Sequence, residues 1–182
     1  MDCFGCGIEG SVEHKYLIAE QEYTGKGTAN RQVAATFTNF DFAGASVLDY
    51  GCGQGLAKDY CSEKFRDCAV YNFDPYWNFD EIRDFERDSN PDKVITCNNV
   101  LNIIKGDYKA LVLDRIYSIA SRNNVRKIIF KIYERNGDGI GVQTGKDGWQ
   151  RNEKTVSYIP AIEDAFKGYS VKRKGLFIIV TK

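Results

Sequence analysis

The chain has 182 residues, a hydrophobic content of 43% and a formal net charge of zero at pH 7. This composition predicts a single domain with an apolar core, spanning residues 1–182, and it excludes an intrinsically disordered chain. The balanced charge argues against a protein that binds nucleic acid mainly through an excess of basic residues, but it permits a local basic patch.

Neither the first residues nor any apolar run predicts export or membrane insertion. Residues 1–6 lack the basic start and apolar stretch of a secretory signal, and the chain has no apolar run of about 18 residues, the length of a membrane span. The six cysteines are therefore expected to remain thiols. Together these features predict a cytoplasmic protein, or one of the host cytosol if a phage encodes it, with no membrane partner.

The N-terminal residues 1–44 are expected to form a helical extension. A short helix is predicted over 12–22, followed by a polar loop. A second helix is predicted from Thr28 to about Phe40, because Val33, Ala34 and Phe37 share one face at helical spacing.

From residue 46 onward, predicted strands alternate with predicted helices. Strands are expected at 46–50, 69–73, 94–97 and 126–133, and helices at 55–65, 108–122 and 159–166, with 78–88 a short helix or irregular. Residues 169–174 and 176–181 flank Gly175 and predict an antiparallel hairpin. The alternation indicates a three-layer, doubly wound α/β fold with a mainly parallel sheet and this hairpin at its end.

Residues 47–55, Val-Leu-Asp-Tyr-Gly-Cys-Gly-Gln-Gly, predict a strand that runs into a tight glycine turn. Glycine has no Cβ, so backbone N–H groups in such a turn can approach a ligand closely. A dinucleotide-binding turn would need its third glycine where Leu56 stands. The carboxylate of Asp49 would repel a phosphate but suits an ammonium group, which favours a cofactor that contains an amino acid.

These residues resemble the class I S-adenosylmethionine-dependent methyltransferases. In that family the first strand ends in acid-x-Gly-x-Gly-x-Gly, and a second acid at the end of the next strand holds the ribose hydroxyls; here that acid is Asp74, 19 residues after Gly55. Residues 92–104 resemble the family's fourth strand, whose last residues face the methyl-donor pocket. The resemblance covers about residues 45–135 and implies a Rossmann-like fold and S-adenosyl-L-methionine as cofactor.

The residues that the resemblance places at the cofactor come from three segments. They are Asp49, Gly51, Cys52, Gly53, Gly55, Asp74, Pro75, Tyr76, Asn98 and Asn99. Each has a plainer alternative: the acids and asparagines could only shape turns, and Tyr76 or Trp77 could be a core aromatic rather than a ring stacked on adenine.

One departure from the family concerns the third strand. Only 17 residues lie between Asp74 and Asp92, so this strand is expected to be reduced or absent. The family's adenine-contacting acid then has no clear counterpart, with Asp80, Glu81 and Asp84 as weak candidates. The shortened pattern also resembles compact methyltransferases of bacterial DNA-modification loci and phages.

The polar, glycine-rich residues 134–158 are predicted to form a substrate-side loop. Basic residues beside an aromatic suit phosphates and a stacked base, although a solvated surface loop is the alternative. The candidate substrate-binding residues are Lys26, Arg31, Trp149 and Arg151. The acceptor is left unidentified, with a nucleic acid or a nucleotide as one candidate, and the absence of Pro-Pro and Pro-Cys motifs disfavours standard base methylation.

Two other functions remain open: a non-catalytic protein that binds the cofactor or a partner, and a nucleic-acid-binding protein with an incidental glycine turn. Methyl transfer needs no protein nucleophile, because the cofactor carries its own leaving group. Cys3 and Cys6 have the spacing of half a zinc site, but no second pair exists, so no metal is expected. His14 is the only histidine, which argues against a hydrolase triad.

Overall fold

The computed structural model describes residues 32–104, 108–143 and 149–182. Within these ranges, seven strands form one sheet in the order β3-β2-β1-β4-β5-β9-β8, and β6 pairs with β7 in a separate ribbon. The strands are β1 (Ser46–Tyr50), β2 (Ala69–Asp74), β3 (Phe79–Asp80), β4 (Lys93–Asn98), β5 (Lys127–Lys131), β6 (Val142–Gln143), β7 (Trp149–Gln150), β8 (Ser170–Lys174) and β9 (Phe177–Thr181).

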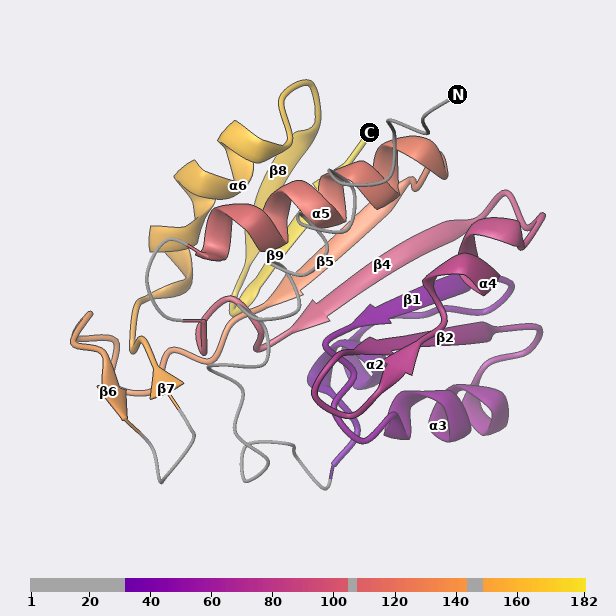
Figure 1. Cartoon of the computed structure of the whole chain (residues 1–182), viewed down its shortest axis with the longest axis horizontal. Coiled ribbons are helices and arrows are strands. Elements are labelled where there is room, and N and C mark those ends of the chain that lie inside the picture. The colour runs from indigo at the N-terminus through magenta and orange to yellow at the C-terminus, as the bar shows by residue number, and fades with distance from the viewer. Residues whose placement is uncertain (1–31, 105–107, 144–148) are drawn as a thin grey trace, which may run out of the picture.

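Helices cover both faces of this sheet (Figure 1). They are α2 (Ala35–Asn39), α3 (Leu56–Lys64), α4 (Ile82–Arg87), α5 (Tyr108–Arg122) and α6 (Ile159–Ala165), with a 3-10 turn η2 (Thr155–Tyr158) before α6. Strands β1, β2, β4 and β5 run parallel, whereas β9 is antiparallel to both β5 and β8. The predicted doubly wound fold with a C-terminal hairpin is therefore confirmed.

Alternating residues of the central strands divide the core into two clusters. Leu48 and Tyr50 of β1 pack with α4, α5 and α6, whereas Val47 packs with α2 and α3 on the other face. Because side chains alternate along a strand, Asp49 lies on the face of Val47, and Thr96 of β4 and Lys131 of β5 follow the same rule. Polar side chains thus replace apolar ones on this face as the parallel strands approach their carboxyl ends.

The third strand is reduced, as the short interval after Asp74 predicted. β3 has only two residues, and it pairs antiparallel with Phe73 and Asp74 at the end of β2. Residues 78–88, expected to be a short helix or irregular, contain β3 and the six-residue helix α4.

The helix predicted from Thr28 to about Phe40 is shorter in its described part, where only Ala35–Asn39 is helical, as α2. Val33 and Ala34 precede α2, and Ala34 has the extended angles φ −60° and ψ 140°. Both residues pack against the core cluster formed with α2 and α3. Their apolar spacing therefore results from burial and does not indicate a helix. Thr28 and the helix predicted over 12–22 lie outside the described residues.

The described residues between 134 and 158 contain more regular structure than the predicted loop. They include β6, β7 and η2, and the backbone N–H of Arg151 donates to the carbonyl of Asn102 at 2.8 Å. This bond ties the segment to the turn after β4. Among the described helices, none combines the length and apolar character that crossing a membrane requires.

Candidate active site at the carboxyl ends of the strands

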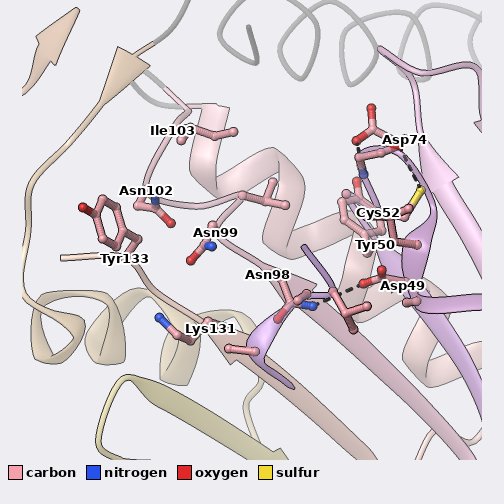
Figure 2. Close-up of a pocket in the computed structure, with 18 of the residues that line it drawn as sticks. Asp49, Tyr50, Cys52, Asp74, Asn98, Asn99, Asn102, Ile103, Lys131 and Tyr133 are labelled. Carbon is pink, nitrogen blue, oxygen red and sulfur yellow. Dashed lines mark hydrogen bonds between the residues drawn. The ribbon is translucent and has the colours of Figure 1, made fainter. Parts of the chain in front are cut away.

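A cavity of about 1020 Å³ opens at the carboxyl ends of β1, β2, β4 and β5 (Figure 2). This volume is at the upper end of the range found for small-molecule sites. Nine of the ten predicted cofactor residues line the cavity: Asp49, Gly51, Cys52, Gly53, Asp74, Pro75, Tyr76, Asn98 and Asn99. Gly55 is not among the lining residues.

The glycine turn between β1 and α3 is built from left-handed backbone conformations. Gly51, Gly53 and Gly55 have φ angles of +80°, +57° and +74°, a region that glycine occupies without the strain of a Cβ. A Cβ on Gly51 would lie 2.2 Å from Cγ2 of Val100, and a Cβ on Gly55 would lie 2.9 Å from Nδ2 of Asn72. Gly55 is thus required by packing inside the protein, away from the cavity.

The carboxylate of Asp74 organises two turns at once. Its Oδ2 accepts the backbone N–H of Gly53 at 2.9 Å, and its Oδ1 accepts those of Tyr76 at 3.0 Å and Trp77 at 3.2 Å. Desolvation raises the pKa of Asp74 more than these three N–H donors lower it. A carboxylate has about four acceptor positions, so Asp74 keeps capacity for a ligand hydroxyl.

Asp49 is a buried carboxylate, only 2% exposed, at the end of β1. Its Oδ1 accepts hydrogen bonds from Thr96 Oγ1 at 2.8 Å and from Asn98 Nδ2 at 3.2 Å. Burial, only partly offset by these two donors, raises the pKa of Asp49 to about 6. Among the described residues no cation forms an ion pair with Asp49, and a buried carboxylate without such a partner is typical of a functional site.

Asn98 and Asn99 differ in what their side chains do. The Oδ1 of Asn98 accepts a hydrogen bond from Thr36 of α2, while its Nδ2 donates to Asp49, so Asn98 joins α2 to β1. Asn99 has a φ of +57°, and its backbone N–H donates to the carbonyl of Lys131 at 2.8 Å. The buried Oδ1 of Asn99 has no hydrogen-bond partner among the described residues.

Cys52 lines the cavity between the two acids, but it lacks the character of a nucleophile. Burial raises the pKa of its thiol well above the ordinary value, and the nearby charges of Asp49 and Asp74 raise it further. The thiol therefore stays protonated at neutral pH.

The predicted substrate residues do not line this cavity where the structure describes them. Arg151 forms an ion pair with Glu153 at 3.0 Å and donates to the carbonyl of Ile104 at 3.3 Å. The ring of Trp149 lies against Gly141, where an added Cβ would come within 2.3 Å of it. Contact of Trp149 or Arg151 with a substrate stays a prediction.

Several other predicted residues lie outside the described ranges: Lys26, Arg31, Cys3, Cys6 and His14. Within the described ranges, no three His, Cys, Asp or Glu side chains gather into a group that could hold a metal ion.

The residues at the opposite end of the cavity were not predicted from the sequence. Asn102, Lys131, Tyr133 and Gln150 line it there. Arg135 also lines the cavity, and the sequence placed it only within the substrate-side loop. Lys131 carried a usable signal, because it ends the apolar run of β5 as Asn98 ends that of β4. Asn102 and Gln150 meet only through tertiary packing.

Residues 22–141 match a protein family described as a methyltransferase domain. The match covers more than half of the chain and includes β1 to β5 with the glycine turn. The chain belongs to this family. As a methyltransferase of this family it is an S-adenosylmethionine-dependent enzyme, and the match does not identify the methyl acceptor. Among curated proteins, none matches the chain.

The residues at the Asp49 end of the cavity fit the methyl donor that the family implies. Asp49 and Asp74 supply two buried carboxylates, and no Lys, Arg or His of the described residues lines this end. Leu56, Ala57 and Phe73 add apolar surface beside them. Two acids with apolar neighbours suit a ligand that combines positive charge, hydroxyl groups and a flat ring.

Proposed function

We propose that the cavity binds S-adenosylmethionine at the end formed by the glycine turn, Asp49 and Asp74, and holds the methyl acceptor at the other end. The observation that carries this proposal is Asp49, a carboxylate buried at a cavity wall with no ion-pair partner among the described residues. A bound cationic ligand would supply the missing positive charge. When bound, the cofactor supplies a sulfonium methyl group as the transferable group.

Four of the lining residues would contact the donor. Asp49 would attract its ammonium group, and Asp74 would accept hydrogen bonds from its ribose hydroxyls. Tyr76 and Trp77, whose ring centroids lie 6.1 Å apart, are the candidates for contact with its adenine. Asn98 holds the Asp49 carboxylate in place, and would therefore affect donor binding only through Asp49.

The protein's contribution to the reaction would be positioning and the exclusion of water. Methyl transfer is a direct displacement, so the rate depends on how closely the two reactants are aligned. α2 closes one side of the cavity through Ala35 and Thr38, while Thr36 bonds to Asn98 behind it. The alignment of the two reactants would therefore depend on the fixed positions of α2 and β4 and not on a reactive side chain of the protein.

The acceptor proposed for the first tests is a nucleotide, free or within a nucleic acid. Two basic residues that line the cavity, Lys131 and Arg135, support an acceptor with a phosphate.

Transfer of labelled methyl from S-adenosylmethionine tests the proposed activity. Wild-type protein and Asp49→Asn are incubated with a cell extract that is then separated into small-molecule, nucleic-acid and protein fractions. We expect label in one fraction with wild type and its loss with the variant. Absence of label from every fraction, or equal label with both proteins, would overturn the proposal.

A further inference from the structure

The cavity separates charges of opposite sign. Figure 2 shows Asp49, Cys52 and Asp74 on one side of Asn98, and the group of Asn99, Asn102, Lys131 and Tyr133 on the other. The carboxylates among the described residues that line the cavity are Asp49 and Asp74, so this second end, the acceptor end, has none and carries the basic Lys131. A ligand that spans the cavity would meet acids at one end and the Lys131 ammonium group at the other.

Lys131 is an unusual residue to bury without a carboxylate. It is 9% exposed, and its Nζ donates one hydrogen bond, to the carbonyl of Ile132 at 2.8 Å. No described carboxylate forms an ion pair with it, and the Oε1 of neighbouring Glu134 instead accepts the backbone N–H of Thr155 at 2.6 Å. An ammonium group has three N–H donors, so two remain for a ligand. Burial lowers the pKa of Lys131, and the nearby charge of Glu134 offsets this only in part.

The side chain of Asn102, also at the acceptor end, has an orientation that is fixed by a chain of hydrogen bonds. The carbonyl of Tyr133 can only accept, so Gln150 presents Nε2 to it, at 2.9 Å. Gln150 must then present Oε1 to Asn102, whose Nδ2 donates to it at 3.1 Å. The atom left over is Oδ1 of Asn102, which is buried in a residue only 1% exposed and has no partner among the described residues.

We infer that the methyl acceptor carries an anionic group that binds Lys131, beside a hydrogen-bond donor that binds Oδ1 of Asn102. The inference rests on the proposed function and adds which chemical groups of the acceptor bind which residues. A phosphate and a carboxylate both supply the anion, and an amino group supplies the donor. The ammonium group of Lys131, which has no ion-pair partner among the described residues, and the Oδ1 of Asn102 lie in one cavity and come from different elements, β5 and the turn after β4.

Matched probes that differ only in the anion test this inference. The protein, loaded with S-adenosylhomocysteine, is titrated with adenosine 5′-monophosphate against adenosine and with anthranilate against aniline. The first pair represents a phosphate acceptor and the second a carboxylate acceptor. We expect the anionic member of at least one pair to bind at least about tenfold more tightly than its neutral partner.

The variants Lys131→Met and Lys127→Met assign the preference to one residue. Lys127 begins β5, four residues before Lys131, and lies away from the cavity. We expect the preference for the anion to vanish in Lys131→Met and to persist in Lys127→Met. If Lys131→Met fails to fold, Lys131→Gln replaces it, with circular dichroism as the check.

The outcomes separate this inference from the proposed function. If wild type binds S-adenosylhomocysteine but neither anionic probe is preferred, or if the preference survives in Lys131→Met, the inference is overturned and the proposed cofactor site stands. If S-adenosylhomocysteine does not bind wild type, the proposed function fails first.

Discussion

The Nδ2 of Asn98 donates a hydrogen bond of 3.2 Å to the Asp49 carboxylate, and so joins the ends of β4 and β1 on one wall of the cavity. Thr96 donates to the same carboxylate oxygen, so both protein donors meet at Oδ1. Asp49 is therefore fixed in orientation while its charge has no ion-pair partner among the described residues. This combination suits binding of a cation but costs stability when no ligand is present.

Replacing this carboxylate should stabilise the ligand-free protein. Burial raises the pKa of Asp49 to about 6, above its value in the unfolded chain, so the folded state loses stability as pH rises from about 4 to about 6. An amide keeps an acceptor for Thr96 and Asn98 without the charge. We expect Asp49→Asn to raise the free energy of unfolding at pH 7 by about 1–3 kcal/mol, measured by urea denaturation.

A matched control for this prediction is Asp114→Asn, the same change on an exposed position of α5. The control should alter stability by less than about 0.5 kcal/mol. The excess stability of Asp49→Asn should also shrink as pH falls toward about 4. If Asp49→Asn is less stable than wild type at pH 7, the Asp49 carboxylate does not destabilise the ligand-free protein.

The affinity for S-adenosylmethionine should depend on pH through the same residue. A cation binds the ionised form of Asp49, so affinity should fall as pH drops below about 6, by at most about tenfold per unit. Calorimetric titration at pH 5 to 8 measures this slope. This pH dependence should be absent from Asp49→Asn. An affinity of wild type that does not change with pH would show that Asp49 does not bind the cationic group of the ligand.

The same substitution at Asp74 should have the opposite effect on stability. Both oxygens of Asp74 accept backbone N–H groups, whereas an amide offers a single acceptor oxygen and turns its NH₂ toward a donor. We expect Asp74→Asn to lower the free energy of unfolding by about 1–3 kcal/mol, in contrast to Asp49→Asn, and to weaken cofactor binding as well. Unchanged stability in a denaturant titration would mean that these N–H groups find other partners.

A pair of glycine variants should separate backbone strain from crowding in the turn. Gly51 and Gly44 have similar φ angles of +80° and +72°, but a Cβ on Gly51 would press on Val100, whereas a Cβ on Gly44 meets nothing within 4 Å. We expect Gly44→Ala to cost about 1–2 kcal/mol from strain alone, and Gly51→Ala to cost more and to weaken cofactor binding. Equal losses of stability in the two variants, with unchanged cofactor binding in both, would show that Gly51 is not part of the cofactor site.

The sequence was sufficient for the central strands and for most of one end of the cavity. β1 and α5 lie at their predicted residues, because buried apolar runs and helical spacing are local signals. The carboxyl ends of parallel strands meet at one edge of a sheet, so the order of the strands alone was enough to place Asp49, Asp74 and Asn98 together.

The acceptor end could not be predicted in the same way, because it depends on contacts between segments distant in sequence. Asn102 and Gln150 are 48 residues apart and meet through one hydrogen bond. Arg151, predicted to bind substrate from its charge, forms an ion pair with Glu153, a contact that composition does not reveal. Lys131 is the exception, because it ends the apolar run of β5 as Asn98 ends that of β4.

Calorimetric titration of S-adenosylmethionine into wild type, Asp49→Asn and Asp114→Asn tests the cofactor site most directly. We predict one binding site per chain in wild type and in the Asp114→Asn control, and binding at least about tenfold weaker in Asp49→Asn. Equal affinity in all three proteins, or no binding to wild type, would contradict a cofactor held by the Asp49 carboxylate.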